Sequence, residues 1–158
     1  MVPVEIISAK ISAIAHSTED PKKVAYALDQ ICSQDEFHPR VVKRLFKGHF
    51  GNPITRVDLD LQRRVAYSFL QHLWSRISLI DRQTLLSELE SRFDEEGRLH
   101  IRIDKQESFR RIIRLQDRDP VKVEFSFRGE SGSAERVRQF LQSVDALKAA
   151  LALKLDDN

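Results

Sequence analysis

The sequence predicts an α+β domain, built as a two-layer sandwich with a mostly antiparallel sheet and helices packed on one face of that sheet. Two observations support this class. Several segments alternate apolar and polar residues with the period of two that strands show, and others repeat apolar residues at the helical period. The helices fall singly or in pairs between strands, which is typical of α+β architecture. At 158 residues the chain is long enough for a real core, so we expect one domain over 1–155 and a frayed end at 156–158.

The N-terminal half predicts a strand, a helix and two further strands. The strand over 4–16 places small apolar residues at its odd positions, so a helix should pack closely over that face. Asp20 and Pro21 are typical of a helix start, and the helix should run to Cys32, which we expect to be a buried, inert thiol. A poorly alternating strand over 41–47 precedes a clean one over 55–61.

The C-terminal half continues with helices and strands in a similar alternation. The expected elements are a helix over 62–75, a helix from a Ser78 cap to about Phe93, strands over 99–103, 110–115 and 121–127, a short helical or irregular crossing over 104–109, and a final helix after Ser133. The final helix carries its apolar residues on one face from Val137 to Leu151, and we expect most of that stripe to be core.

The composition excludes several classes of protein. No apolar run reaches the roughly 18 residues of a transmembrane helix, and the N-terminus has no secretory pattern. One cysteine permits no intrachain disulfide, so a reducing, cytoplasmic setting is expected. Formal net charge is only +2, but segments 40–64 and 98–128 carry +5 and +4, while the rest is acidic. If these two strand-rich segments share a sheet, they form one basic patch, although exposed strands also carry cations for solubility and edge protection.

Enzymatic motifs are not found. The chain has no phosphate-binding glycine loop, no Gly-x-Gly-x-x-Gly and no Gly-x-Ser-x-Gly elbow. Its five histidines are scattered, and only His16, His49 and His100 would meet at strand ends as an acid, a base or metal ligands. We therefore expect no catalytic residue, cofactor or metal, and keep a histidine-based phosphodiesterase or nuclease as a third hypothesis.

The stretch from Lys47 to Ile54 carries the strongest local signal. Two glycines and an Asn-Pro pair make a rigid turn, which a plain hairpin connection would also explain. The turn also carries His49 beside Phe50, with cations close by in the chain, and these groups suit RNA bases and phosphates.

These observations favour an RNA-binding protein. Phe50 and His49 would contact a base or ribose, Gln106 would bind a base edge, and nine cations would contact phosphates: Lys43, Arg44, Lys47, Arg56, Arg102, Lys105, Arg110, Arg111 and Arg114. The alternative is a protein–protein adaptor that docks on an RNA-processing assembly through its helices or a sheet edge. Pairing of sheet edges would also permit a homodimer.

Three motifs resemble those of a small archaeal family described as RNA-binding or predicted exosome-associated. They are Lys47-Gly-His-Phe-Gly-Asn-Pro-Ile54, Ile103-Asp-Lys-Gln106 and His16-Ser-Thr-Glu-Asp-Pro21. The resemblance implies a fold like that of the ribosomal protein that binds five-S ribosomal RNA, and a role in RNA processing or ribosome biogenesis. It adds Asn52 to the RNA-binding set and marks His49, Asp104, Lys105 and Gln106 as motif positions. Phe50 replaces the family's usual tyrosine, which keeps stacking but removes a hydroxyl.

Overall fold

The sheet has five strands, and all its neighbouring pairs are antiparallel. A computed structural model describes residues 3–32, 42–47 and 53–156, with the backbone alone for 42–47 and Pro53. Its strands are β1 (Ile6–Ala15), β2 (Val42–Lys47), β3 (Pro53–Gln62), β4 (Leu99–Ile103) and β5 (Val121–Phe127). Their order across the sheet is β2-β3-β1-β5-β4, so the first strand of the chain lies in the centre.

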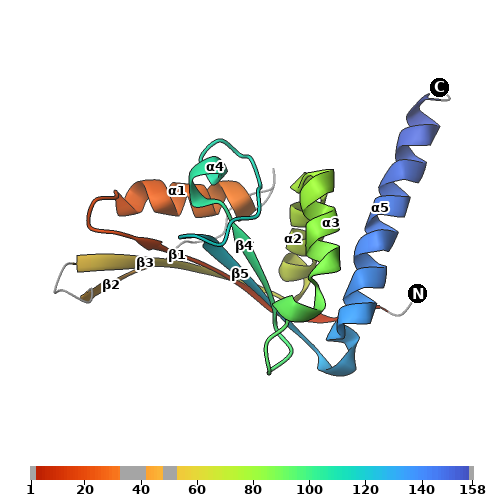
Figure 1. Ribbon diagram of the computed structural model, residues 1–158, viewed down its shortest axis with the longest axis horizontal. Helices are drawn as coiled ribbons and strands as arrows, with labels where there is room; N and C mark the ends of the chain where they lie inside the picture. The colour runs from red at the N-terminus through yellow and green to blue at the C-terminus, as the bar shows by residue number, and fades with distance from the viewer. Residues whose placement is uncertain (1–2, 33–41, 48–52, 157–158) are drawn as a thin grey trace.

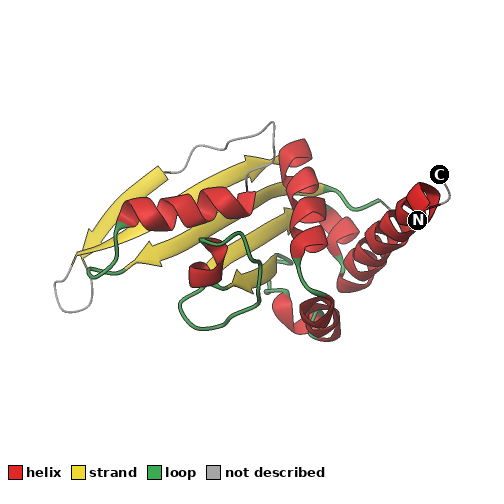
Figure 2. Cartoon of the chain, turned by 90° about the horizontal axis from the view of Figure 1, so that it is seen from above, coloured by secondary structure: helices red, strands yellow, loops and turns green. Residues whose placement is uncertain are grey.

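The helices form a second layer on one face of this sheet. They are α1 (Pro21–Cys32), α2 (Arg63–Arg76), α3 (Leu79–Ser87), α4 (Lys105–Ser108) and α5 (Ala134–Asp156), with 3₁₀ turns η1 (Glu90–Arg92) and η2 (Gly129–Gly132). Helix α1 lies along the strands and α2 stands across one end of the sheet, while no helix of the described residues lies on the opposite face (Figures 1 and 2). The predicted two-layer α+β sandwich with an antiparallel sheet is therefore confirmed.

The core fills the space between the two layers. Small residues of β1, such as Ala9 and Ala13, are buried and let α1 and α2 approach the sheet closely. Larger side chains complete the core at the α2 end, where the rings of Phe69 and Phe125 stack with centroids 5.7 Å apart. Cys32 is buried as predicted, and burial raises the pKa of its thiol well above the ordinary value.

Helix α2 follows β3 with no connecting residue. Gln62 is still paired with Ser8 of β1, and Arg63 already begins the helix. The chain makes this sharp turn by placing Arg63 in the left-handed region, at a φ of 40°. That conformation costs a non-glycine residue roughly 1 kcal/mol, so the surrounding structure must hold it in place.

Two predicted elements are wrong. No strand forms over 110–115, because Arg111 has a φ of 62° and interrupts the extended backbone; only Ile113 and Leu115 make isolated bridges. The helix predicted to reach Phe93 ends at Ser87 and gives way to η1. The apolar stripe predicted for this helix still contributes to the core, since Leu85 and Leu89 are fully buried.

Helix α5 is only partly packed. Its first turns bury Val137, Phe140 and Leu141, but Leu147 and Leu151 are 63% and 54% exposed, so the predicted stripe is core only at its N-terminal end. The rest of the helix projects beyond the sandwich (Figure 1). No helix in the described ranges has the length and apolar character needed to cross a membrane.

Candidate nucleic-acid interface

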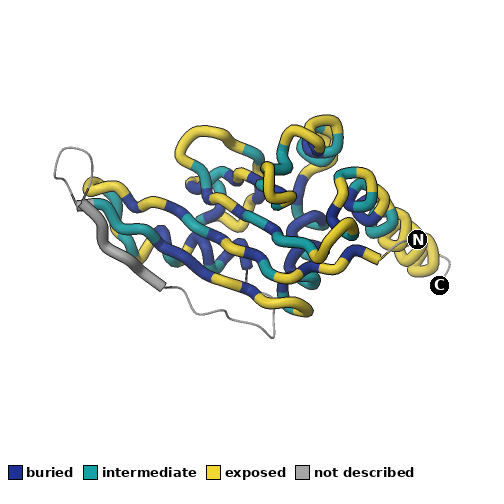
Figure 3. Tube along the Cα trace, turned by 90° about the horizontal axis from the view of Figure 1, so that it is seen from below, coloured by how far each residue is buried: buried dark blue, intermediate teal, exposed yellow. Residues whose placement is uncertain are grey.

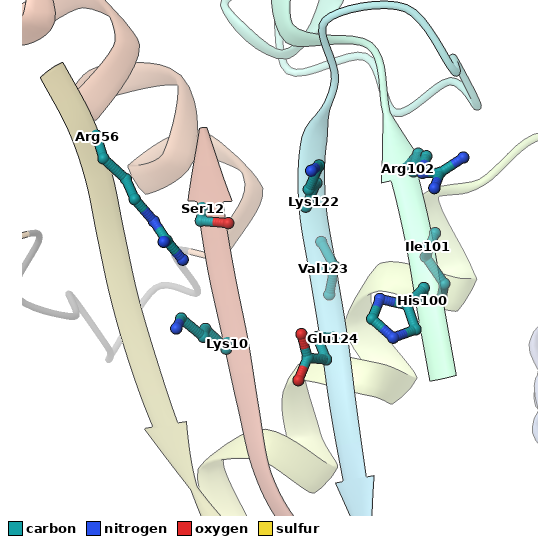
Figure 4. A pocket seen from close by; sticks show the side chains of 9 residues that line it. All are labelled: Lys10, Ser12, Arg56, His100, Ile101, Arg102, Lys122, Val123 and Glu124. Atoms are coloured by element: carbon teal, nitrogen blue, oxygen red, sulfur yellow. The ribbon is translucent and has the colours of Figure 1, made fainter. Parts of the chain in front are cut away.

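The face of the sheet without helices is mainly polar, apart from the exposed Ile14 of β1, and it is hollowed. Buried residues alternate with exposed or half-buried ones along much of β1, β4 and β5, as the colours of Figure 3 show from below. A shallow pocket of about 310 Å³ lies at the middle of this face. Its wall includes one cation from each of four neighbouring strands: Arg56, Lys10, Lys122 and Arg102 (Figure 4). We call this set of four residues the sheet-face cations.

Two of these cations are free to take a ligand. Lys10 and Lys122 are exposed, and neither forms an ion pair with another residue of the described chain. Arg102 is paired only with Asp117 at 3.8 Å, where both side chains are largely exposed, so water and salt weaken that contact. These three ammonium and guanidinium groups can therefore exchange water for phosphate at little cost.

Carboxylates on the same face are mostly neutralised by arginines, one of which is the sheet-face cation Arg56. Asp58 accepts a hydrogen bond from Arg56 at 2.8 Å, and Glu124 is paired with Arg98 at 3.2 Å. Asp60 of β3 and Glu124 of β5 both lie opposite Lys10 in the register, one on each side, and limit the positive charge there. The face is thus moderately basic, with its two unpaired lysines on the neighbouring strands β1 and β5.

The structure brings together only part of the predicted RNA-binding set. Arg56 and Arg102 line the pocket as described above. The backbone of β2 places Arg44 opposite Arg56 and Lys47 opposite Pro53, so these residues and Lys43 lie on β2, the edge strand next to β3. His49, Phe50 and Asn52 lie outside the described residues.

Other predicted contacts lie away from this face. Gln106 and Arg110 belong to α4 and the turn after it, which pack beside α1 in the helical layer. Arg111 donates a hydrogen bond to Gln30 of α1. Arg114 is exposed on the irregular segment where a strand was predicted. The basic residues of segment 98–128 are therefore split between two sides of the molecule and form no single patch.

The prediction for Lys105 must be corrected. Its side chain is 1% exposed, and its ammonium donates to Glu19 at 2.9 Å, to Asp119 at 2.7 Å and to the Ile14 carbonyl at 2.9 Å. All three donors are used, so no phosphate can be contacted there. Lys105 instead joins α4 to the end of β1.

Residues of two resemblance motifs meet in this cluster. His16 and Glu19 come from one motif and Lys105 from the other, and His16 lies 3.0 Å from Asp119. Partial burial acts to raise the pKa of Asp119, but hydrogen bonds from Lys105 and His16 lower it below its ordinary value. These motif positions thus serve a structural ion cluster in this chain.

A histidine-based catalytic site is not assembled by the described residues. His100 lies level with Lys10 in the sheet, and His16 follows Lys10 by six residues, just beyond the end of β1, which is roughly 20 Å at the usual strand rise. Each has its own carboxylate, Asp119 for His16 and Asp94 for His100. His16, Glu19 and Asp119 could hold a metal by geometry, but the Lys105 ammonium already supplies the positive charge.

Sequence reasoning missed Lys10 and Lys122 as candidate contacts. Each occupies a polar position in a strand that alternates cleanly, which was the available signal that both lie on the open face. What the sequence did not show is that the two strands are neighbours, with Lys122 paired opposite Ser12.

Comparison with known proteins identifies relatives. A family described as RNA binding matches residues 8–127. A Pyrococcus abyssi protein named as an RNA-binding protein is 31% identical over 145 residues, which cover 86% of this chain and 94% of the relative. The crystal structure of an Archaeoglobus fulgidus protein, 30% identical, covers 88% of this chain and 99% of its own with a TM-score of 0.69. A Sulfolobus solfataricus structure shares the fold at 22% identity, covering 86% and 98% with a TM-score of 0.70.

Proposed function

Because this chain belongs to the RNA-binding protein family, we propose that it is a non-enzymatic RNA-binding protein that holds RNA on the open face of its sheet. The observation that carries this proposal is the pocket on that face, lined by the four sheet-face cations. A phosphate backbone laid over the pocket would meet Lys10 and Lys122 without first displacing a protein carboxylate.

Phosphate contacts dominate this mode of binding. Among the described residues that line this pocket, the one aromatic ring is the His100 imidazole, which is hydrogen-bonded to Asp94 at 2.7 Å, so the face would bind mainly the phosphate backbone. We therefore expect little sequence preference from this face. Base contacts by Phe50 and His49, and further phosphate contacts by Lys43, Arg44 and Lys47, would extend the interface beyond β3.

Salt dependence tests the proposal directly. Four phosphate contacts to a single strand predict a slope of about −2.8 for log affinity against log salt, or a loss of about 50-fold between 50 and 200 mM. Fluorescence anisotropy with a labelled 12-nucleotide RNA would measure it. The Lys10→Ala, Lys122→Ala double variant should reduce the magnitude of the slope by about 1.4.

A matched control lies on the other side of the molecule. Lys22 and Lys23 are exposed on α1, in the helical layer, so Lys22→Ala, Lys23→Ala removes the same charge without touching the open face. The control should retain the wild-type slope. Equal losses in both double variants would mean that overall charge, and not this face, sets the affinity. Absence of RNA binding at low salt would refute the proposed function.

A second candidate function is an adaptor in an RNA-processing or ribosome-biogenesis assembly, the setting that the family resemblance implies. The exposed apolar residues near the end of α5 favour it: Leu147, Leu151, Leu153 and Leu155. Truncation after Asp145 should leave RNA affinity unchanged but remove any protein partner that co-purifies after nuclease treatment. Light scattering of the full chain would show whether that partner is a second copy. A truncated chain that keeps its partner would argue against α5 as the docking element.

A further inference from the structure

A second, larger pocket lies at the end of the sheet where β1 begins and β3 and β5 end. It encloses about 550 Å³ and is lined by three arginines, Arg63, Arg64 and Arg128, together with Tyr67 and Glu5. Three guanidiniums face one carboxylate there, so the pocket carries excess positive charge. Its volume is within the range typical of ligand-binding sites.

The arginines of this pocket are held by the fold and are little neutralised. The direct turn from β3 into α2 fixes Arg63 and Arg64 at the end of the sheet. Among the described residues neither forms an ion pair, and both are exposed. Arg128 reaches Glu5 only at 3.8 Å, where the two side chains are 79% and 59% exposed, so that contact is weak.

Tyr67 gives the pocket a fixed aromatic wall. It is half-buried on the first turns of α2, and its ring packs against Phe140 of α5 with centroids 5.3 Å apart and planes tilted by 54°. A ring held in this way loses little entropy when a base stacks on it. Arginines beside a fixed aromatic ring are the combination that single-stranded RNA sites use.

We propose that this pocket binds one nucleotide of the RNA, with the arginines on its phosphates and Tyr67 stacked on its base. The proposal rests on the proposed function, because the same RNA would occupy both pockets. Arg63, the first residue of α2, follows Asp60 of β3 by three residues, or roughly 10 Å at the usual strand rise, and Asp60 is paired with Lys10. A single strand running along β1 would therefore pass from the sheet-face cations into this pocket.

Two kinds of variant separate the charge of the pocket from its stacking. Arg63→Gly, Arg64→Gln removes two phosphate contacts, and glycine accepts the positive φ at position 63, so the fold is preserved. We expect its salt slope with the labelled 12-nucleotide RNA to weaken by about 1.4. Tyr67→Leu should instead lower the affinity at least 5-fold with an unchanged slope, while Tyr67→Phe should bind like the wild type.

Controls make each outcome decisive. Lys22→Gln, Lys23→Gln removes two charges from α1 and should keep the wild-type slope. Arg128 is exposed and lies outside α2, so Arg128→Gln tests the same pocket without changing that helix. This variant should weaken the salt slope by about 0.7, which a folding defect in the α2 variants would not explain. If Lys10→Ala, Lys122→Ala weakens binding but the arginine and tyrosine variants match the control, this pocket is not an RNA site although the proposed function stands. If the wild type binds no RNA, the proposed function itself fails.

Discussion

Replacing Lys105 by methionine tests whether its buried ammonium is structural. Methionine keeps most of the side-chain volume but removes the hydrogen bonds to Glu19, Asp119 and the Ile14 carbonyl. It also leaves two carboxylates close together without the charge between them. The variant should therefore be less stable, while the open face of the sheet is untouched.

The size of the expected loss of stability follows from how far Lys105 and its two carboxylate partners are buried. Removing one partner of a fully buried ion pair costs about 3–5 kcal/mol, because the remaining charge is left uncompensated. Glu19 and Asp119 are 22% and 47% exposed, so water can partly solvate them in the variant. We therefore expect the free energy of unfolding to fall by about 2–3 kcal/mol at pH 7.

Urea unfolding followed by tryptophan fluorescence measures this loss, and pH adds a second check. Because the folded-state pKa of Asp119 is lowered, its stabilising contribution is present above the ordinary value of 3.8 and is lost as the pH falls through the lowered pKa. The difference in the free energy of unfolding between the wild type and Lys105→Met should thus become smaller in acid. A variant as stable as the wild type would show that the buried ammonium is not structural, and a variant that is folded but binds RNA tenfold more weakly would show that Lys105 contacts phosphate.

Three further predictions concern packing and charge. A Cβ at Gly132 would lie 2.2 Å from the Cβ of Phe127, so Gly132→Ala should cost about 1–3 kcal/mol in a thermal or urea melt. Asp145 accepts a hydrogen bond from Trp74 at 2.9 Å and fastens α5 to α2; Asp145→Ala should lower the free energy of unfolding by about 1–2 kcal/mol and alter the tryptophan emission. Hydrogen bonds from a histidine and from an arginine backbone N–H hold the pKa of Asp94 well below its usual range. Asp94→Asn should therefore reduce the free energy of unfolding at neutral pH. In an acid titration, the difference in this free energy between the variant and the wild type should disappear only below about pH 4.

The sequence was sufficient for most of the fold because alternation and periodicity record which side of an element is buried. The strands over 99–103 and 121–127 appear where predicted, and the small residues of β1 do lie under helices. The segment 110–115 has strand-like residues, but the left-handed backbone at Arg111 breaks it, and the sequence carries no glycine there to signal the turn. The exposure of Leu147 could not be predicted from the sequence either, because an apolar stripe does not show whether another element packs against it.

The candidate site was less predictable because it depends on which strands are neighbours. Arg56 and Arg102 were expected from local basic charge, and both lie on the open face. Lys105 was expected to be exposed for the same reason, yet acidic residues far apart in the sequence enclose it. Lys10 lies in the acidic segment 1–39, so local charge did not mark it, and its place on the basic surface follows from the pairing of β1 with β5.

The central position of β1 also determines when the domain can form during synthesis. This strand is made first, but its partner β5 follows more than 100 residues later. Until residue 127 has left the ribosome, one edge of β1 has unpaired backbone groups that another chain could bind. A nascent chain stalled after α3 would therefore be prone to aggregate, and release of β5 is the step that protects it.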